Sequence, residues 1–185
     1  MWAVDHGWMP TSYGRVMVAA PFVTASLQLA EGVDLKAKIL CIGLGGGGIN
    51  MFFASKFPKT HVTVVEIEPV VVWLARRWFD VGIRDNHDVR TMNGVRYIME
   101  SGTVAVNVLQ LQSADKKLEA VVKVFKRNFV NCITARMEEG NLLLICFNHT
   151  PPTREISLLR KRFGEVWYRL QSDDLSEISH LAFYS

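Results

Sequence analysis

The sequence lacks the marks of several protein classes. Its most apolar stretch, residues 16–30, is too short to cross a membrane and is interrupted by Pro21 and polar residues. The N-terminus carries Asp5 and His6 where a secretion signal would have basic residues followed by an apolar core. We therefore expect a cytoplasmic protein without a membrane anchor, and 185 residues are enough for one hydrophobic core.

An excess of one charge is also missing. The chain has 21 Lys and Arg against 18 Asp and Glu, a net charge of +3, and its basic residues are scattered along the sequence. The densest basic run, Arg160 to Arg162, is followed by Glu165, which is typical of a solvated helix face. This distribution argues against nucleic acid as a partner.

Cysteine is scarce. The 3 cysteines, Cys41, Cys132 and Cys146, each lie within an apolar run typical of a β-strand, and their spacing does not match a metal site. We therefore expect buried free thiols, as in a reducing compartment, and no bound metal.

Strand-like and helix-like segments alternate through most of the chain. Apolar, β-branched runs predict strands at 38–43, 61–66, 88–92, 103–111, 129–135 and 142–147. Helical spacing predicts helices at 15–30, 49–57, 70–79, 115–125 and 155–163, followed by a short piece at 167–170 and a polar end. The continuous apolar run at 38–43 is typical of a strand buried on both faces.

This alternation predicts an α/β fold with a Rossmann-like, mostly parallel sheet and a C-terminal antiparallel hairpin at 129–147. We expect a single domain, 1–185, made of a helical lead at 1–36, a core at 37–148 and a tail at 149–185. Trp73, Trp78 and Phe79 have the spacing of a core-facing helix, whereas His6 is expected at the surface and His87 in a turn.

The stretch 38–53, KILCIGLGGGGINMFF, places five glycines in six positions after the first predicted strand. Gly43, Gly45 and Gly47 form a GxGxG pattern, which is weak by itself. Here a helix follows, and a second strand then ends in Glu66, at about the ~20-residue distance at which an acid binds a ribose. The pattern favours a nucleoside-containing cofactor over a purely structural turn.

Several motifs together resemble one family. DHGWMPTSYGRVMVA, ILCIGLGGGGINMFF, FPKTHVTVVEIEP, the Trp78-Phe79 pair and NGVRYI are similar to the spermidine-synthase-like class I S-adenosylmethionine-dependent methyltransferases. Within that group they resemble the branch with the C-terminal domain of the translation elongation factor one-alpha methyltransferase. The first hundred residues match well, and the predicted hairpin matches more loosely.

The resemblance implies S-adenosylmethionine as cofactor and assigns its binding residues. Gly43, Gly45 and Gly47 would line the methionine part, Glu66 would hold the ribose, and Ile67 would pack on the adenine. The family's Asp-Gly pair after the third strand is replaced here by Asn93-Gly94, whose amide oxygen can still accept a hydrogen bond. Arg15 completes this set, because it matches a family position near the polar end of the cofactor.

The chain also departs from the family. It passes from Ile98 to Val104 across one short loop, although a parallel crossover needs a dozen residues or more. We therefore expect that the family's fourth strand and its acidic loop are missing. This loss argues against aminopropyl transfer, leaves the catalytic residue unknown, and exposes sheet edges that favour self-association.

Two functions remain open from the sequence. The chain is expected to be a methyltransferase, acting on a protein amine, or a catalytically inactive cofactor-binding or protein-interaction variant of the same fold. The motifs favour the first hypothesis, and the missing central segment favours the second. An NAD-binding fragment is a third and weaker alternative, because a dinucleotide normally needs a second half-sheet.

Overall fold

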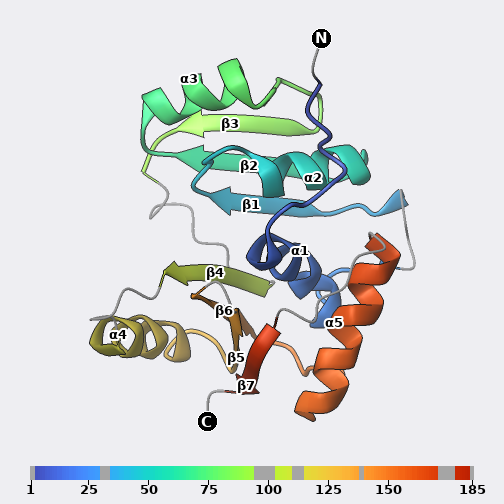
Figure 1. Cartoon of the computed structure of the whole chain (residues 1–185), viewed down its shortest axis with the longest axis vertical. Helices are drawn as coiled ribbons and strands as arrows, with labels where there is room; N and C mark the ends of the chain where they lie inside the picture. Colours follow the sequence, from blue (N-terminus) through green and yellow to red (C-terminus); the bar gives the residue numbers. More distant parts are fainter. Residues whose placement is uncertain are drawn as a thin grey trace. The chain divides into compact units, whose positions relative to one another are not determined.

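The computed structural model describes residues 3–29, 34–93, 103–109, 115–137, 140–170 and 178–183 (Figure 1). The chain forms two compact units. The first unit contains Met1–Met9 and Gln28–Met99, and the second contains Pro10–Leu27 and Glu100–Ser185. No helix among the described residues is long and apolar enough to cross a membrane.

The first unit is built on a parallel sheet. Its strands are β1 (Lys38–Ile42), β2 (His61–Glu66) and β3 (His87–Thr91), in the order β1-β2-β3. Helix α2 (Gly48–Lys56) connects β1 to β2, and helix α3 (Pro69–Trp78) connects β2 to β3 (Figure 1). Read from β3 to β1, this order is the first half of the doubly wound arrangement. The predicted Rossmann-like parallel core is thus confirmed.

The prediction that the first strand is buried on both faces is wrong. The burial of β1 ranges from half-buried to exposed, and Ile42 has 63% of its surface accessible, whereas Val62 and Val64 of β2 are fully buried. The physical reason is its position: among the described strands β1 pairs only with β2, so it is an edge strand with the composition of a central one.

The second unit is built on an antiparallel sheet. Its strands are β4 (Thr103–Leu109), β5 (Asn131–Met137), β6 (Asn141–Phe147) and β7 (Ile178–Phe183), in the order β4-β6-β5-β7. The predicted hairpin is confirmed as β5 and β6, and β4 pairs with its second strand. The sequence predicted only a polar C-terminal end and missed β7, which pairs antiparallel with β5.

Among the described residues, the middle of the chain has fewer strands than a typical methyltransferase fold. Within the described residues, β3 is followed directly by β4, and β4 pairs with the hairpin. The sequence of residues 95–99 predicts little more than one helical turn, and this segment lies outside the described residues. The absence of a further strand between β3 and β4 in the part of the chain that is described agrees with the predicted shortening.

Helices complete the second unit: α1 (Ser12–Val23), α4 (Asp115–Lys126) and α5 (Ile156–Leu170). The tail at 156–170 is one helix where the sequence suggested a break, and Phe163 and Trp167 are fully buried on it. The basic run at its start is not entirely solvated. Arg162 is half-buried, and its Nε and Nη2 donate to the carbonyl oxygens of Val23 and Phe22 at 2.8 and 3.3 Å. It therefore caps the carboxyl end of α1.

The cysteine prediction is wrong for two of the three residues. Cys132 of β5 and Cys146 of β6 are register partners across the hairpin and form a disulfide. Both are buried in a cluster with Val122, Leu142 and Leu144. Cys41 in β1 is a free thiol, and burial raises its pKa to about 12, so it is not a reactive thiolate near neutral pH.

Candidate functional site

The carboxyl ends of the three parallel strands meet at one edge of the first sheet. The N–H of Gly43, directly after β1, donates to the backbone carbonyl of Val65 in β2 at 2.8 Å. The N–H of Met92, directly after β3, donates to the backbone carbonyl of Glu66 at 2.9 Å. Such an edge is where open α/β sheets bind ligands. The structure thus brings the glycine stretch, Glu66 and Asn93 to the same edge, as the sequence predicted.

The side chain of Glu66 turns toward the glycine stretch. Its Oε2 accepts the backbone N–H of Leu44 at 2.8 Å, and its Oε1 accepts the backbone N–H of Glu68 at 3.0 Å. Only 8% of the residue is exposed. The carboxylate therefore lies against the turn between β1 and α2, rather than in bulk water.

Backbone amides keep this carboxylate charged. Burial raises the pKa of Glu66, but hydrogen bonds from backbone N–H groups outweigh that effect, so the pKa lies below its usual value; the donors belong to Glu68, Leu44, Ile67 and Gly45. The site consequently carries a fixed negative charge at neutral pH. An ionised carboxylate is a strong acceptor for hydroxyl groups such as those of a ribose.

The glycine stretch adopts a conformation that other residues avoid. Gly43, Gly45 and Gly47 have φ angles of 89°, 53° and 78°, all in the left-handed region. A Cβ added at Gly43 or Gly45 would meet nothing within 4 Å, whereas one at Gly47 would lie 2.4 Å from Cγ2 of Val81. The first two glycines therefore present bare backbone to open space, and the third is required by internal packing.

Helix α2 begins at the end of this turn. Its first residue is Gly48, and its N-cap residue, Gly47, has no side chain with which to cap the first turn. The first amides of a helix carry a partial positive charge and bind anions or carboxylates. The turn and the helix start together suit the charged end of a nucleoside-containing ligand.

The remaining predicted residues differ in their positions. Ile67 is 60% exposed next to Glu66, and Asn93 is exposed at the end of β3. Gly94 lies outside the described residues. Arg15 belongs to α1 of the second unit, where its Nη2 donates to the carbonyl of Pro10 at 3.4 Å. Its role toward a cofactor stays a prediction.

Two residues beside the turn were missed as parts of it. The ring of Phe79 would lie 3.5 Å from a Cβ at Gly46, and Val81 fills the space behind Gly47. The expectation that the aromatic residues of α3 face the core is wrong, because Trp73 and Trp78 are 60% and 65% exposed and Phe79 is 48% exposed. No local signal in the sequence connects Phe79 and Val81 with the glycine turn, because these contacts join segments that lie far apart in the chain.

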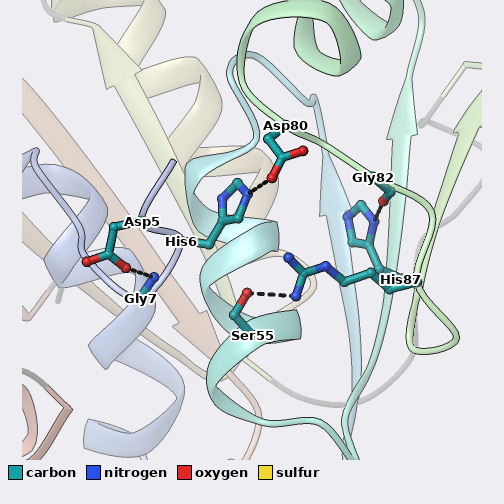
Figure 2. Close-up of polar contacts among 8 residues, drawn as sticks. Asp5, His6, Gly7, Ser55, Asp80, Gly82 and His87 are labelled. Carbon is teal, nitrogen blue, oxygen red and sulfur yellow. Dashed lines mark hydrogen bonds and ion pairs between the residues drawn. The ribbon is translucent and has the colours of Figure 1, made fainter. Parts of the chain in front are cut away.

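The N-terminal segment brings a histidine to the residue that follows Phe79. Nε2 of His6 lies 3.5 Å from Oδ2 of Asp80, and the His6 side chain is only 8% exposed (Figure 2). The prediction that His6 lies at the surface is therefore wrong. Asp80 itself has a φ of 52°, a conformation uncommon for a residue with a side chain.

His87 closes a turn, as predicted, because its N–H donates to the carbonyl oxygen of Arg84 at 3.0 Å, and its side chain is buried. Its Nδ1 faces the carbonyl oxygen of Gly82 at 3.3 Å (Figure 2). Its Nε2 accepts a hydrogen bond from Nδ2 of Asn50 at 2.8 Å. These partners define the neutral ring with the proton on Nδ1. Burial lowers the pKa of His87, which keeps the ring neutral. His87 thus joins the first turn of α2 to the start of β3.

Metal chemistry finds no support in the described part of the chain, where no group of three or more His, Cys, Asp or Glu residues could hold an ion. The site consists of the charged Glu66 carboxylate, the bare backbone of the glycine turn, the start of α2 and the exposed Ile67. This combination provides binding and orientation, and its described residues include no evident nucleophile.

The chain is similar to known proteins across most of its length. It is 32% identical over 189 residues to an eEF1A lysine and N-terminal methyltransferase homolog of Drosophila melanogaster, covering 97% of this chain and 28% of that protein. It is 33% identical over 96 residues to the eEF1A lysine and N-terminal methyltransferase of Danio rerio, covering 52% of this chain and 14% of that protein. The chain thus spans less than a third of the length of these relatives. No family model matches it.

Solved structures share the fold. Human methyltransferase-like protein 13 in complex with SAH superposes with a TM-score of 0.73 at 17% identity, covering 89% of this chain and 94% of that chain. A probable spermidine synthase from Corynebacterium glutamicum gives a TM-score of 0.66 at 14% identity, with 85% and 72% covered. The chain is therefore a spermidine-synthase-like member of the class I S-adenosylmethionine-dependent methyltransferase fold, homologous to the C-terminal region of the eEF1A lysine and N-terminal methyltransferases.

Proposed function

We propose that this chain binds S-adenosylmethionine at the carboxyl edge of its parallel sheet and transfers the methyl group to an amine of a protein. The observation that carries the proposal is the position of the Glu66 carboxylate, 2.8 Å from the Leu44 nitrogen beside open space above Gly43 and Gly45. The homology to methyltransferases whose name refers to the protein eEF1A supports a protein as the acceptor.

In this proposal each part of the site has a binding role. Glu66 accepts hydrogen bonds from the ribose, the exposed Ile67 packs on the adenine, and Asn93 accepts or donates one hydrogen bond to its edge. The bare backbone at Gly43 and Gly45 and the start of α2 receive the charged amino acid end. The cofactor supplies a methyl group already activated by its sulfonium, so the protein mainly aligns the acceptor.

A catalytically inactive cofactor-binding protein is the second candidate. It is favoured by the short connection of residues 92–102 between β3 and β4, which leaves little chain for an acceptor-binding loop. Under this alternative the cofactor site is intact, and only transfer is lost. The two candidates therefore agree on binding and differ in turnover.

Calorimetric titration with S-adenosylhomocysteine tests the shared claim. The native chain is expected to bind, and Glu66→Ala is expected to bind roughly tenfold or more weakly, because a hydrogen bond to a charged group is worth about 1.5–3 kcal/mol. Glu68→Ala is the matched control, since it removes a neighbouring exposed carboxylate and leaves Glu66 in place. Equal affinity in both variants, or preferred binding of NAD, would overturn the site.

A second assay separates the two candidates. Labelled S-adenosylmethionine is incubated with the chain and cell proteins, and the label is located on protein. Transfer that is lost in Glu66→Ala supports the enzyme. Binding without transfer at any protein supports the inactive variant.

A further inference from the structure

The outer face of α3 is unusually apolar. Val70, Trp73, Leu74 and Trp78 are 63%, 60%, 40% and 65% exposed, and only Val72 and Ala75 of this helix are buried. Trp73 and Leu74 follow Val70 by three and four positions, and Trp78 follows Leu74 by four, so the four residues line one side of the helix. We call them the α3 stripe.

A stripe of this kind is large enough to matter for association. Aromatic side chains bury about 150–250 Å² each, so two tryptophans and two aliphatic residues at these exposures offer roughly 400 Å² in one molecule. Two such surfaces facing each other would bury roughly 800–1,000 Å², which is the size of a weak and reversible interface. Tryptophan is also the residue type most enriched among those that dominate binding energy.

The two ends of α3 carry opposite charges. Glu68 is the N-cap residue, and Arg76 and Arg77 stand in the last turn. The guanidinium of Arg77 lies 5.2 Å from the centre of the Trp78 ring. A second α3 running in the opposite direction places Glu68 of each molecule near Arg77 of the other, and it also opposes the two helix dipoles favourably. The surface is thus complementary to itself.

We propose that the α3 stripe is the surface through which two copies of this chain associate, with their α3 helices packed antiparallel about a twofold axis near Trp73. Such an interface is isologous, because each copy uses the same residues. The apolar stripe supplies the contact, and the Glu68–Arg77 pairs set the direction. The inference concerns self-association and does not depend on the proposed enzyme function.

Sedimentation velocity over a range of protein concentrations tests the proposal. The native chain is expected to shift reversibly from monomer to dimer, and Trp73→Ala and Trp78→Ala are each expected to weaken the dimer at least tenfold. Ile83→Ala is the matched control, because Ile83 is 87% exposed in the same unit but lies outside the helix. A monomer at every concentration, or a dimer that responds equally to all three substitutions, overturns the proposal.

Charge reversal tests the antiparallel arrangement independently, because it leaves the apolar surface in place. Glu68→Arg and Arg77→Glu are each expected to weaken the dimer, and the double variant is expected to restore it, most clearly at low salt. A double variant as weak as the single ones contradicts the antiparallel arrangement. Circular dichroism of every variant establishes that the fold is kept, so that lost association is assigned to the interface.

Discussion

The Oε2 atom of Glu66 accepts the backbone N–H of Leu44 at 2.8 Å, although the two residues are 22 positions apart. This bond ties the end of β2 to the turn that follows β1. Backbone N–H groups meet both carboxylate oxygens, so a ligand hydroxyl reaches Glu66 by sharing an oxygen that is already bonded to the turn. The same side chain therefore contributes to the stability of the site and to its proposed chemistry.

Replacing Glu66 with Gln should lower the free energy of unfolding. The amide would turn an NH₂ group toward a backbone N–H of Leu44 or Glu68, leaving a buried donor unsatisfied at a cost of about 1–3 kcal/mol. Because the folded pKa of Glu66 lies below 4.5, its contribution is present above that pH and is lost as the pH falls through the lowered pKa. Urea unfolding of the native chain and of Glu66→Gln at pH 7 and pH 3.5 measures the difference in their free energies of unfolding. The same difference at both pH values would contradict the prediction.

Alanine at Gly47 should be more damaging to stability than alanine at Gly45. Both substitutions force a side chain into the left-handed region, at a cost of about 1–2 kcal/mol, but only the Gly47 methyl meets Val81 at 2.4 Å. We expect a loss above about 2 kcal/mol for Gly47→Ala and a smaller one for Gly45→Ala. Thermal unfolding compares the two, and equal losses would show that Val81 moves aside.

Gly45→Ala, the less destabilising of these two variants, should be the one that weakens binding of S-adenosylhomocysteine more. The methyl of Gly45→Ala stands in the open space above the turn, where the ligand is proposed to approach. Its S-adenosylhomocysteine affinity is expected to fall by roughly tenfold at a temperature where both variants are folded. Unaltered affinity would place the ligand elsewhere.

Stability should fall below neutral pH because of His87. Its folded pKa is lowered from 6.5, so below that pH the unfolded chain binds more protons than the folded one. The free energy of unfolding therefore decreases as the pH drops from about 6.5, by at most about 1.4 kcal/mol per pH unit. His87→Gln should flatten this slope, while His61→Gln, at an exposed position, should not. Similar slopes in both variants would assign the effect to other groups.

Arg162 should stabilise the second unit through α1. Its guanidinium donates to two carbonyl oxygens at the end of that helix, so Arg162→Met is expected to cost about 1–3 kcal/mol. Arg160→Met, two residues earlier at an exposed position of α5, should change stability by less than about 0.5 kcal/mol. Chemical denaturation measures both, and comparable losses would remove the capping role.

The disulfide should be visible in both chemistry and stability. Under denaturing conditions without a reductant, only the Cys41 thiol should react with a thiol reagent. Reducing the Cys132–Cys146 bond, which spans 14 positions, should lower the free energy of unfolding by about 2–3 kcal/mol. Three reactive thiols in the untreated protein would contradict the bond.

The order of elements could be predicted from the sequence because the signals are local. Strand-like and helix-like periods, the glycine stretch and the acid at the end of β2 are all properties of short segments. Their convergence at one edge follows from parallel strands ending on the same side. For this reason the sequence alone predicts a common edge of the sheet for Gly43, Gly45, Glu66, Ile67 and Asn93.

What the sequence did not reveal depends on contacts between distant segments. The composition of KILCI is that of a central strand, but its partners decide that β1 is an edge. Helix α5 continues through Gly164 because Phe163 and Trp167 pack into the core. The Cys132–Cys146 bond depends on the register of the hairpin, which the strand-like composition of 129–135 and 142–147 does not determine.

The packing of Gly47 against Val81 has a consequence for related sequences. A side chain at position 47 is compatible with this backbone only if position 81 loses its γ-methyl groups, and even then the left-handed φ favours glycine or asparagine. The two positions should therefore covary among homologues: a larger residue at 47 should be found with alanine or glycine at 81. Such paired replacements would reflect the steric contact between the two positions and not selection for ligand binding.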